Sequence, residues 1–338
     1  MAGETANIAE MARKQATELF EVFGWRQVGP TDQNWSCATK GHGKGQNVMH
    51  PTDSVYHYDD PYHTKRIYLN TDLKSYARDS ITDGSIVSAL TSLSKATECA
   101  NKSEGWQKLY APDGKNYRVI GLLYIFNHDG EYDKDFSSRI LDIRSPRIGL
   151  RKGYRVVALG PPDLVYLSSV AQDILAQITR EGLPPMAKIR FYYPELIQRR
   201  TQLNLARAAT IEVLTAPWQV FHYATSSGGE GPGGYYLYYR GAGETLDEFK
   251  YIIDYIFRYQ LLREAPSVQI RVPFASNDAA SNFGKAKESY AQDFYGFEEY
   301  GKEEFAKRLE QISFQSIAFV STKYSGIEIG MERAHGKV

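Results

Sequence analysis

The chain has 338 residues, of which 42% are hydrophobic, a length and composition that predict two domains with packed cores. Its formal net charge of +0 argues against bulk electrostatic attraction to nucleic acid, so any DNA-binding surface must be a local basic patch. Only two cysteines, Cys37 and Cys99, and no signal peptide or long apolar run are found, which predicts a cytoplasmic protein without structural disulfides or membrane contact.

The first predicted element is a helix over residues 8–23, with Asn7 as its N-cap and apolar residues at helical spacing along one side. At about 100° per residue, Glu18 falls on the edge of the apolar stripe and is the acid of this helix best placed to face the domain interior. A solvated glutamate that flanks the stripe is the alternative. Residues 24–49 are polar and rich in glycine, which predicts a loop or an irregular strand.

Cys37, His42 and His50 lie in and just after this loop and suggest zinc ligands. Their spacing matches no closed site with four ligands, and the fourth would have to come from His57 or His63. The interpretation we favour is that the glycines let the loop approach a phosphate backbone, with three side chains available for contact: Lys40, His42 and Lys44.

The following stretch, residues 50–76, predicts a tight β-hairpin. Residues 54–58 form its first strand, Asp59-Asp60-Pro61 supplies turn chemistry, and residues 66–76 form its second strand. The second strand alternates between an apolar core face and a polar face. The hairpin therefore brings Asp53, which precedes the first strand, towards two residues of the polar face, Asp72 and Lys74.

Two carboxylates that converge on one spot repel each other unless a cation lies between them, and oxygen ligands favour Mg²⁺ or Mn²⁺. Such a metal lowers the pKa of a bound water and neutralises charge on a phosphate. Lys74, two residues beyond Asp72 on the same face, can position the attacking water or stabilise the developing charge. The pattern therefore predicts phosphodiester chemistry.

At these residues the chain resembles the PD-(D/E)XK nuclease superfamily, which includes many restriction endonucleases and repair nucleases. Pro51-Thr52-Asp53 stands for the first half-motif, with one extra residue between proline and aspartate, and Asp72-Leu73-Lys74 matches the second. The resemblance implies a three-layer α/β/α restriction-endonuclease-like core, with Asp53, Asp72 and Lys74 as catalytic residues. It also implies a further metal ligand from the leading helix, which we assign to Glu18 beside Asp53 and Asp72.

The remaining elements of this predicted domain fit the same architecture. An apolar run in residues 116–127 predicts a central strand, and a strand-helix-strand crossover of this length implies parallel pairing. Gly182 and Pro184-Pro185 mark a boundary, which gives a nuclease-like domain over 1–183 and a second domain over 184–338. The other expected elements are a helix opened by a Ser80/Asp83 capping box and reaching about residue 102, a strand at 154–159 and a helix at 161–179.

The second domain has the predicted order β-α-β-β-α-β, which resembles a ferredoxin-like α+β domain. Tyr235 to Tyr239 are nearly all tyrosine, which fits core packing, a protein interface or base stacking. The expected strands are 188–193, 210–214, 220–225, 235–240, 268–274 and 312–321, and the expected helices are 195–206 and 245–262, with residues 277–310 helical towards their end.

These features predict a metal-dependent DNA endonuclease or exonuclease in restriction or anti-phage defence, with a C-terminal domain for assembly or substrate recognition. The alternative is a non-catalytic DNA-binding or scaffold subunit that kept the fold. The presence of Asp53, Asp72 and Lys74 favours the enzyme, whereas the neutral charge and the tyrosine-rich half favour assembly as a homo-oligomer or with a partner protein. No Walker loop or G-x-S-x-G elbow is present, which argues against ATP-driven or serine-hydrolase activity.

Overall fold

The chain divides into two units, the first comprising residues 1–165 and 321–334 and the second residues 166–320 and 335–338. The division falls inside helix α5 (Pro161–Arg180), whereas the boundary predicted at 183/184 lies just beyond the end of that helix. The limits of independently folding domains stay a prediction. The computed structural model describes residues 2–39, 42, 48–63, 65–112, 114, 116–180, 183–194, 204–224, 233–295, 302–325 and 330–335.

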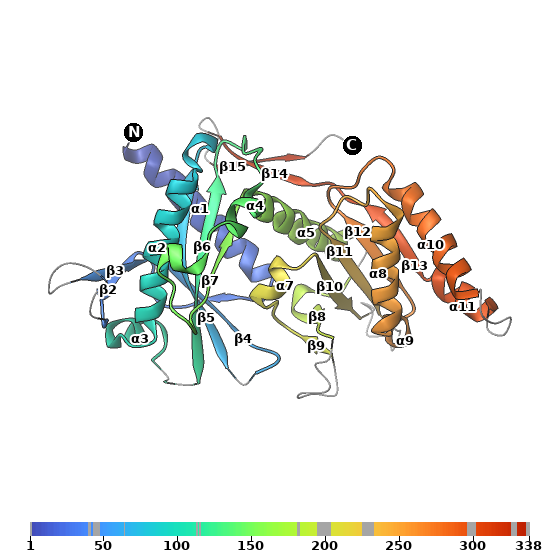
Figure 1. The fold of residues 1–338 in the computed structure, drawn as a ribbon, viewed down its shortest axis with the longest axis horizontal. Helices are drawn as coiled ribbons and strands as arrows, with labels where there is room; N and C mark the ends of the chain where they lie inside the picture. The colour runs from blue at the N-terminus through green and yellow to red at the C-terminus, as the bar shows by residue number, and fades with distance from the viewer. Residues whose placement is uncertain are drawn as a thin grey trace. The chain divides into compact units, whose positions relative to one another are not determined.

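The first unit is built on a five-stranded mixed sheet (Figure 1). Its first three strands are antiparallel and its last three are parallel, with β5 common to both sets. The predicted hairpin and the predicted parallel crossover are therefore confirmed. In sheet order, the strands are β1 (Arg26–Gln27), β4 (Ser54–Asp59), β5 (Arg66–Tyr76), β6 (Tyr117–Asn127) and β7 (Val156–Leu159).

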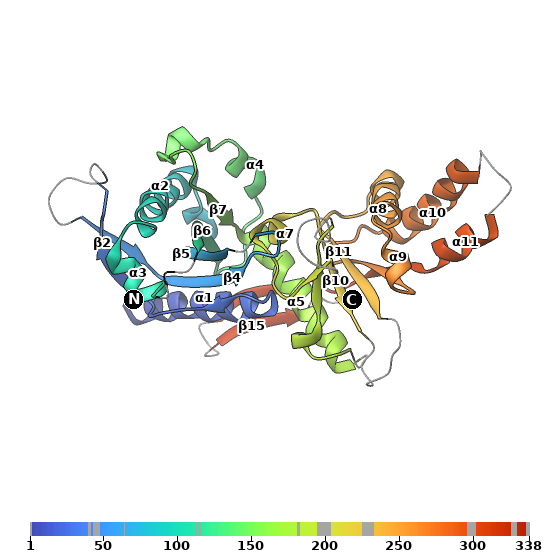
Figure 2. The ribbon, with the colours of Figure 1, turned by 90° about the horizontal axis from the view of Figure 1, so that it is seen from below.

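Helices cover both faces of this sheet, as Figure 2 shows for α1 (Ala2–Val22) and α2 (Asp83–Ala100). Phe20 of α1 packs edge-on against Tyr56 and Tyr124. These tyrosines lie opposite Leu69 and Leu73 of β5, and residues directly opposite in adjacent strands share a face. Helix α1 therefore covers the odd-numbered face of β5.

Helix α2 covers the even-numbered face. Gly121 of β6 lies opposite Asn70, and a Cβ atom at Gly121 would clash with Thr97 and Leu93 of α2. Glycine is required here because the helix approaches the sheet backbone closely. Together with α3 (Glu104–Tyr110), α2 completes the predicted α/β/α layering of the first unit.

One local prediction is wrong, and another holds in part. Helix α2 is capped by Thr82 rather than by Ser80, because Thr82 accepts a hydrogen bond from the backbone N–H of Ser85 while the Ser85 hydroxyl accepts one from the Thr82 N–H. Residues 24–49, predicted as a loop or an irregular strand, contain β1 and also β2 (Gln33–Ser36), which pairs with β3 (Met49–Thr52) as a separate two-stranded sheet.

The second unit contains a six-stranded sheet in the order β13-β12-β11-β10-β8-β9. Strands β11, β12 and β13 are parallel, and β10, β8 and β9 continue the sheet with antiparallel pairing. This pairing differs from the predicted ferredoxin-like domain, whose sheet is antiparallel. The strands are β8 (Arg190–Tyr192), β9 (Leu205–Ala206), β10 (Trp218–Tyr223), β11 (Gly234–Tyr239), β12 (Val268–Val272) and β13 (Ile312–Ser316).

The helices of this unit follow the predictions in part. The strand predicted at 210–214 is instead helix α7 (Ile211–Thr215), because Thr210 acts as its N-cap and accepts from the Val213 N–H. The helix predicted at 195–206 falls largely outside the described residues, and its last two positions belong to β9. The other helices are α8 (Leu246–Arg258), α9 (Leu261–Glu264), α10 (Ala279–Tyr295) and α11 (Lys302–Glu310).

The two units share one connectivity. In the first, α1 precedes the antiparallel strands β1, β4 and β5, and helical crossovers lead to the parallel strands β6 and β7. In the second, α5 precedes the antiparallel strands β8, β10 and β11, and helical crossovers lead to the parallel strands β12 and β13. In each unit, additional short elements are inserted between the first two of these strands.

The remaining described elements are short. They are helix α4 (Phe136–Leu141), the 3₁₀ turns at Arg78–Ser80, Ser145–Ile148 and Met186–Lys188, and the paired strands β14 (Val320–Ser325) and β15 (Gly330–His335). Within the described ranges, we find no helix with the length and apolar character needed to cross a membrane.

Candidate active site

Asp53 lies between β3 and β4, directly before the Ser54–Thr71 pair that ends the β4–β5 ladder, and Asp72 directly follows Thr71. Its backbone N–H donates to the Thr71 carbonyl at 3.2 Å, and its Oδ2 accepts from the Leu73 N–H at 2.7 Å. These two bonds hold the Asp53 carboxylate against the strand segment that carries Asp72. The structure therefore brings the two predicted acids together.

Lys74 forms an ion pair with Asp72, with 2.6 Å between its Nζ and the Asp72 Oδ1. Burial of Lys74 works against its charge, but the carboxylates of Asp72 and Asp53 outweigh burial and raise the pKa of the lysine. In the absence of another cation, the ammonium group of Lys74 thus compensates part of the charge of the paired acids.

These three residues open into a cavity of about 420 Å³ between the hairpin and α2. The helix contributes serine, alanine and leucine side chains, so the wall opposite the acids is uncharged. A phosphate group can approach such a wall without charge repulsion. The remaining lining residues are Pro51, Tyr76, Ser85, Ser88, Ala89, Ser92, Leu93 and Ala96.

Burial raises the pKa of Asp53 from its usual 3.8 to about 6, opposed by the hydrogen bond from the Leu73 N–H. The charge of Asp72 adds to the increase, and that of Lys74 lowers it. A carboxyl group in this position has an unfavourable charge that a divalent cation would compensate. The donor chemistry of Asp53 and Asp72, two carboxylates that converge on a polar cavity, therefore fits a Mg²⁺ or Mn²⁺ ion.

The structure does not bring Glu18 to this site. Asp72 and Lys74 are on the even-numbered face of β5, under α2, whereas Glu18 belongs to α1 on the opposite face. The Glu18 side chain is 52% exposed and lies 3.9 Å from the Lys14 ammonium group. The exposed Glu18 fits the alternative of a solvated glutamate beside the apolar stripe, and the sheet separates it from the paired acids.

On the polar face of β5, the side chains line the cavity from Asp72 onwards, whereas the side chain directly before Asp72 on this face is covered by other residues. Asn70, two residues earlier on the same face, is buried, and its Oδ1 accepts from the Trp106 indole N–H at 3.0 Å and from the Thr52 hydroxyl at 2.7 Å. The Thr52 hydroxyl in turn accepts from the Trp35 indole N–H at 2.8 Å. This buried network fixes the end of β3 on β5, immediately before Asp53.

The cysteine and histidine residues that were weighed as zinc ligands, but not favoured as such, also meet. Cys37, His42 and His50 converge, and the fourth partner is Cys99 of α2 rather than His57 or His63. Sequence reasoning missed Cys99 because it lies far along the chain, although it is the only other cysteine. Of the three predicted phosphate contacts, Lys40 and Lys44 lie outside the described residues, and the prediction is wrong for His42, whose side chain is buried.

Removing the ionisable group of Asp53 should stabilise the metal-free protein at alkaline pH. Because the pKa is raised in the folded state, the folded protein loses stability as the pH rises from about 4 to 6, and the whole loss persists above that range. Asparagine cannot ionise, and its Oδ1 can still accept from the Leu73 N–H. In EDTA at pH 8, we expect Asp53→Asn to increase the free energy of unfolding by about 1 to 3 kcal/mol.

Urea unfolding at pH 4 and pH 8 tests this expectation, since the difference between variant and wild type should vanish at pH 4. Asp59→Asn, at the other end of the same hairpin, is a control that should decrease the free energy of unfolding at pH 8. The reason is that Arg66 lowers the pKa of Asp59 and so stabilises its charged form in the folded protein. An equal effect of Asp53→Asn at both pH values would show that burial of its charge is not the cause.

An α/β/α core with a β-hairpin at its centre is consistent with the fold implied by the resemblance to PD-(D/E)XK nucleases. The family model of the GAPS4 protein PD-(D/E)XK nuclease domain matches residues 1–163. The predicted resemblance to the superfamily is thereby confirmed for this part of the chain. No curated protein and no solved structure matches the chain.

Proposed function

We propose that the first unit is a metal-dependent nuclease that hydrolyses phosphodiester bonds of DNA. The observation that carries the proposal is the meeting of Asp53, Asp72 and Lys74 in one cavity of a nuclease-type domain. Asp53 and Asp72 would hold Mg²⁺ or Mn²⁺, which supplies a more acidic bound water and neutralises phosphate charge.

Lys74 has a separate role in this proposal. Its ammonium group lies on the same strand face as Asp72 and borders the cavity, where it can orient an attacking water or stabilise charge that develops on the phosphate. The hydroxyl groups of Ser88 and Ser92 on α2 face the same cavity and can donate hydrogen bonds to phosphate oxygens.

A nuclease assay tests the proposal directly. We expect the purified chain to cleave at least one of linear double-stranded, circular and single-stranded DNA in Mg²⁺ or Mn²⁺ and to be inactive in EDTA. Absence of cleavage on all three substrates, by protein shown to be folded, would contradict an autonomous nuclease and leave the non-catalytic alternative.

The second unit supports a non-catalytic role for that part of the chain. On the face of β11 that packs against α8, the side chains are Tyr235, Leu237 and Tyr239, and the next position on this face is Gly241. The equivalent face of β5 carries Asp72 and Lys74. The second unit thus repeats the connectivity of the first without an acid or lysine at these positions, and we assign it to assembly or DNA recognition.

DNA binding in Ca²⁺ separates the two candidate functions. If Asp53 and Asp72 repel a phosphate, DNA binding by the wild-type chain should be weak in EDTA and should strengthen in Ca²⁺ at fixed ionic strength. A scaffold that binds DNA through lysine and arginine should show little change in DNA affinity with Ca²⁺ and a strong decrease in affinity with monovalent salt.

A role in restriction or anti-phage defence, a cytoplasmic location and assembly with a partner are part of this proposal.

A further inference from the structure

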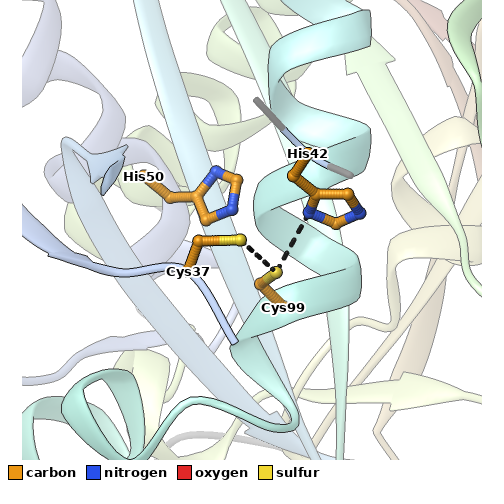
Figure 3. Close-up of side chains that lie close together, drawn as sticks. All are labelled: Cys37, His42, His50 and Cys99. Atoms are coloured by element: carbon orange, nitrogen blue, oxygen red, sulfur yellow. Dashed lines mark hydrogen bonds between the residues drawn. The ribbon is translucent and has the colours of Figure 1, made fainter. Parts of the chain in front are cut away.

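A cluster of four side chains lies beside the candidate active site, and we refer to Cys37, His42, His50 and Cys99 as the Cys₂His₂ cluster (Figure 3). One ligand atom from each residue lies within 4.8 Å of all the others. The two sulfur atoms are 3.4 Å apart, and the Cys99 Sγ is 3.1 Å from the His42 Nδ1. Such proximity of four metal-binding atoms from separate segments is the observation to be explained.

The four residues come from the β2–β3 segment and from helix α2. Cys37 directly follows β2, His50 belongs to β3, and His42 lies on the connection between them. Cys99 comes from the last turn of α2. A shared metal ion would therefore tie the β2–β3 hairpin to the helix that forms the opposite wall of the active-site cavity.

We propose that the Cys₂His₂ cluster is a structural zinc site. Zinc in proteins takes tetrahedral sulfur and nitrogen ligands at about 2.3 Å and 2.0–2.1 Å, which places the ligand atoms about 3.3 to 3.8 Å from one another. The S–S separation of 3.4 Å lies in this range, the Cys99 Sγ to His42 Nδ1 separation of 3.1 Å lies slightly below it, and no separation in the cluster exceeds 4.8 Å. With four protein ligands, the site has no open position for a water or a substrate, which is the property of a structural rather than a catalytic site.

The surroundings of His42 independently support metal binding. Its Nε2 lies 3.3 Å from the Oε2 of Glu98, a buried carboxylate that also receives the Arg151 guanidinium at 2.7 Å. An Nε2–H that donates to Glu98 leaves Nδ1 as the free acceptor, and Nδ1 is the atom that faces Cys99. A carboxylate that orients the far side of a histidine ring is a recurring feature around metal ligands.

His50 provides a second independent observation. Its side chain is buried, and among the described residues its Nε2 has no hydrogen-bond partner. A buried nitrogen without a partner is unfavourable unless something outside the protein chain satisfies it.

The donor set decides which metal fits. Two thiolates and two imidazoles suit zinc, whereas Mg²⁺ and Ca²⁺ require oxygen ligands. The Cys₂His₂ cluster and the paired acids are therefore two sites with different metal preferences. They are adjacent in the chain, because His50 is followed by Pro51, Thr52 and Asp53. Bound zinc would fix the strand that positions Asp53.

Metal analysis of the full chain, purified without chelator, tests the proposal. We expect one zinc per chain for the wild type and less than about 0.1 for Cys99→Ser and His50→Gln. His57→Gln and His63→Gln are matched controls, because both histidines lie in the first unit outside the cluster and should leave the zinc content at one. Loss of zinc in both controls would overturn the assignment of ligands.

A measurement on the wild type covers the case in which the cluster variants fail to fold. Chelation should release one zinc and at the same time expose two thiols to a thiol reagent, and replacement by Co²⁺ should give the absorption of a tetrahedral ion with sulfur ligands. Zinc-free folded protein that takes up no Co²⁺ would overturn the proposal. So would an intact mass lower by two hydrogens, which would show a disulfide between Cys37 and Cys99.

Discussion

Asp72→Asn should reduce DNA cleavage by about a hundredfold to a thousandfold or more while the first unit remains folded. Asp72 is one of only two carboxylates among the described residues that line the cavity, and its substitution removes half of the negative charge available to a divalent cation. Asparagine has nearly the same volume, so the packing around β5 should persist. Cleavage rates in Mg²⁺ and circular dichroism at the same protein concentration provide the measurement.

Lys74→Met separates the role of the lysine from that of the acids. We expect a similar loss of cleavage, because the charge that faces the phosphate is absent, but tighter binding of Ca²⁺. The Lys74 ammonium group lies 2.6 Å from the Asp72 Oδ1 and competes with any other cation for that carboxylate. Calorimetric titration with Ca²⁺ should therefore show weaker binding for Asp72→Asn and stronger binding for Lys74→Met.

Asp59→Asn is the matched control for both variants. Asp59 lies at the far end of the same hairpin, pairs with Arg66 and is 74% exposed in its side chain, so its substitution should change neither cleavage nor Ca²⁺ binding. Cleavage by Asp72→Asn at the wild-type rate would remove this residue from the mechanism. Weaker Ca²⁺ binding by Lys74→Met would show that the lysine supports the metal site instead of competing with it.

The hairpin could be predicted because its information is local. The alternation along residues 66–76 and the turn chemistry of Asp59-Asp60-Pro61 fix the pairing, and the pairing brings Asp53 close to Asp72. Glu18 shows the limit of this reasoning. Periodicity reveals which side of a helix faces the interior, but the face of the sheet that receives the helix depends on packing between distant segments.

Cys99 and the second unit show the same limit. The Cys₂His₂ cluster needs a ligand from the end of α2, and no local spacing connects that position with Cys37, His42 and His50. In the second unit, most strands were predicted, but the order of elements does not determine which strands pair. Parallel pairing of β11, β12 and β13 became visible only in the three-dimensional arrangement.

Loss of the buried ion pair between Arg271 and Asp173 should destabilise the second unit strongly. The Arg271 Nε and Nη2 donate to the two carboxylate oxygens of Asp173 at 2.6 and 2.8 Å, and the side chains are only 4% and 12% exposed. The Tyr238 hydroxyl donates to the same carboxylate at 2.6 Å. Removal of one partner leaves a buried charge, so we expect Arg271→Met to cost about 3 to 5 kcal/mol.

This ion pair lies on the face of the sheet that packs against α5, because Asp173 belongs to α5 and Arg271 lies opposite Tyr238 in the adjacent strand. In the first unit, by contrast, the paired acids lie on the sheet face covered by α2, and not on the face covered by α1, the helix that corresponds to α5. We therefore interpret the pair as a structural link between α5 and the sheet, and not as a second catalytic site. Arg308→Met is the control, since Arg308 forms an exposed pair with Glu304 and should change stability by less than about 1 kcal/mol.

The double variant Asp173→Leu with Arg271→Met distinguishes a structural pair from a site. Replacement of both charges by apolar groups removes the unpaired charge, so the double variant should recover a large part of the stability that Arg271→Met loses. Calorimetric unfolding of the full chain provides the comparison. At a temperature where all variants are folded, cleavage should equal that of the wild type. A double variant that is stable but inactive would show that Arg271 or Asp173 takes part in the nuclease reaction.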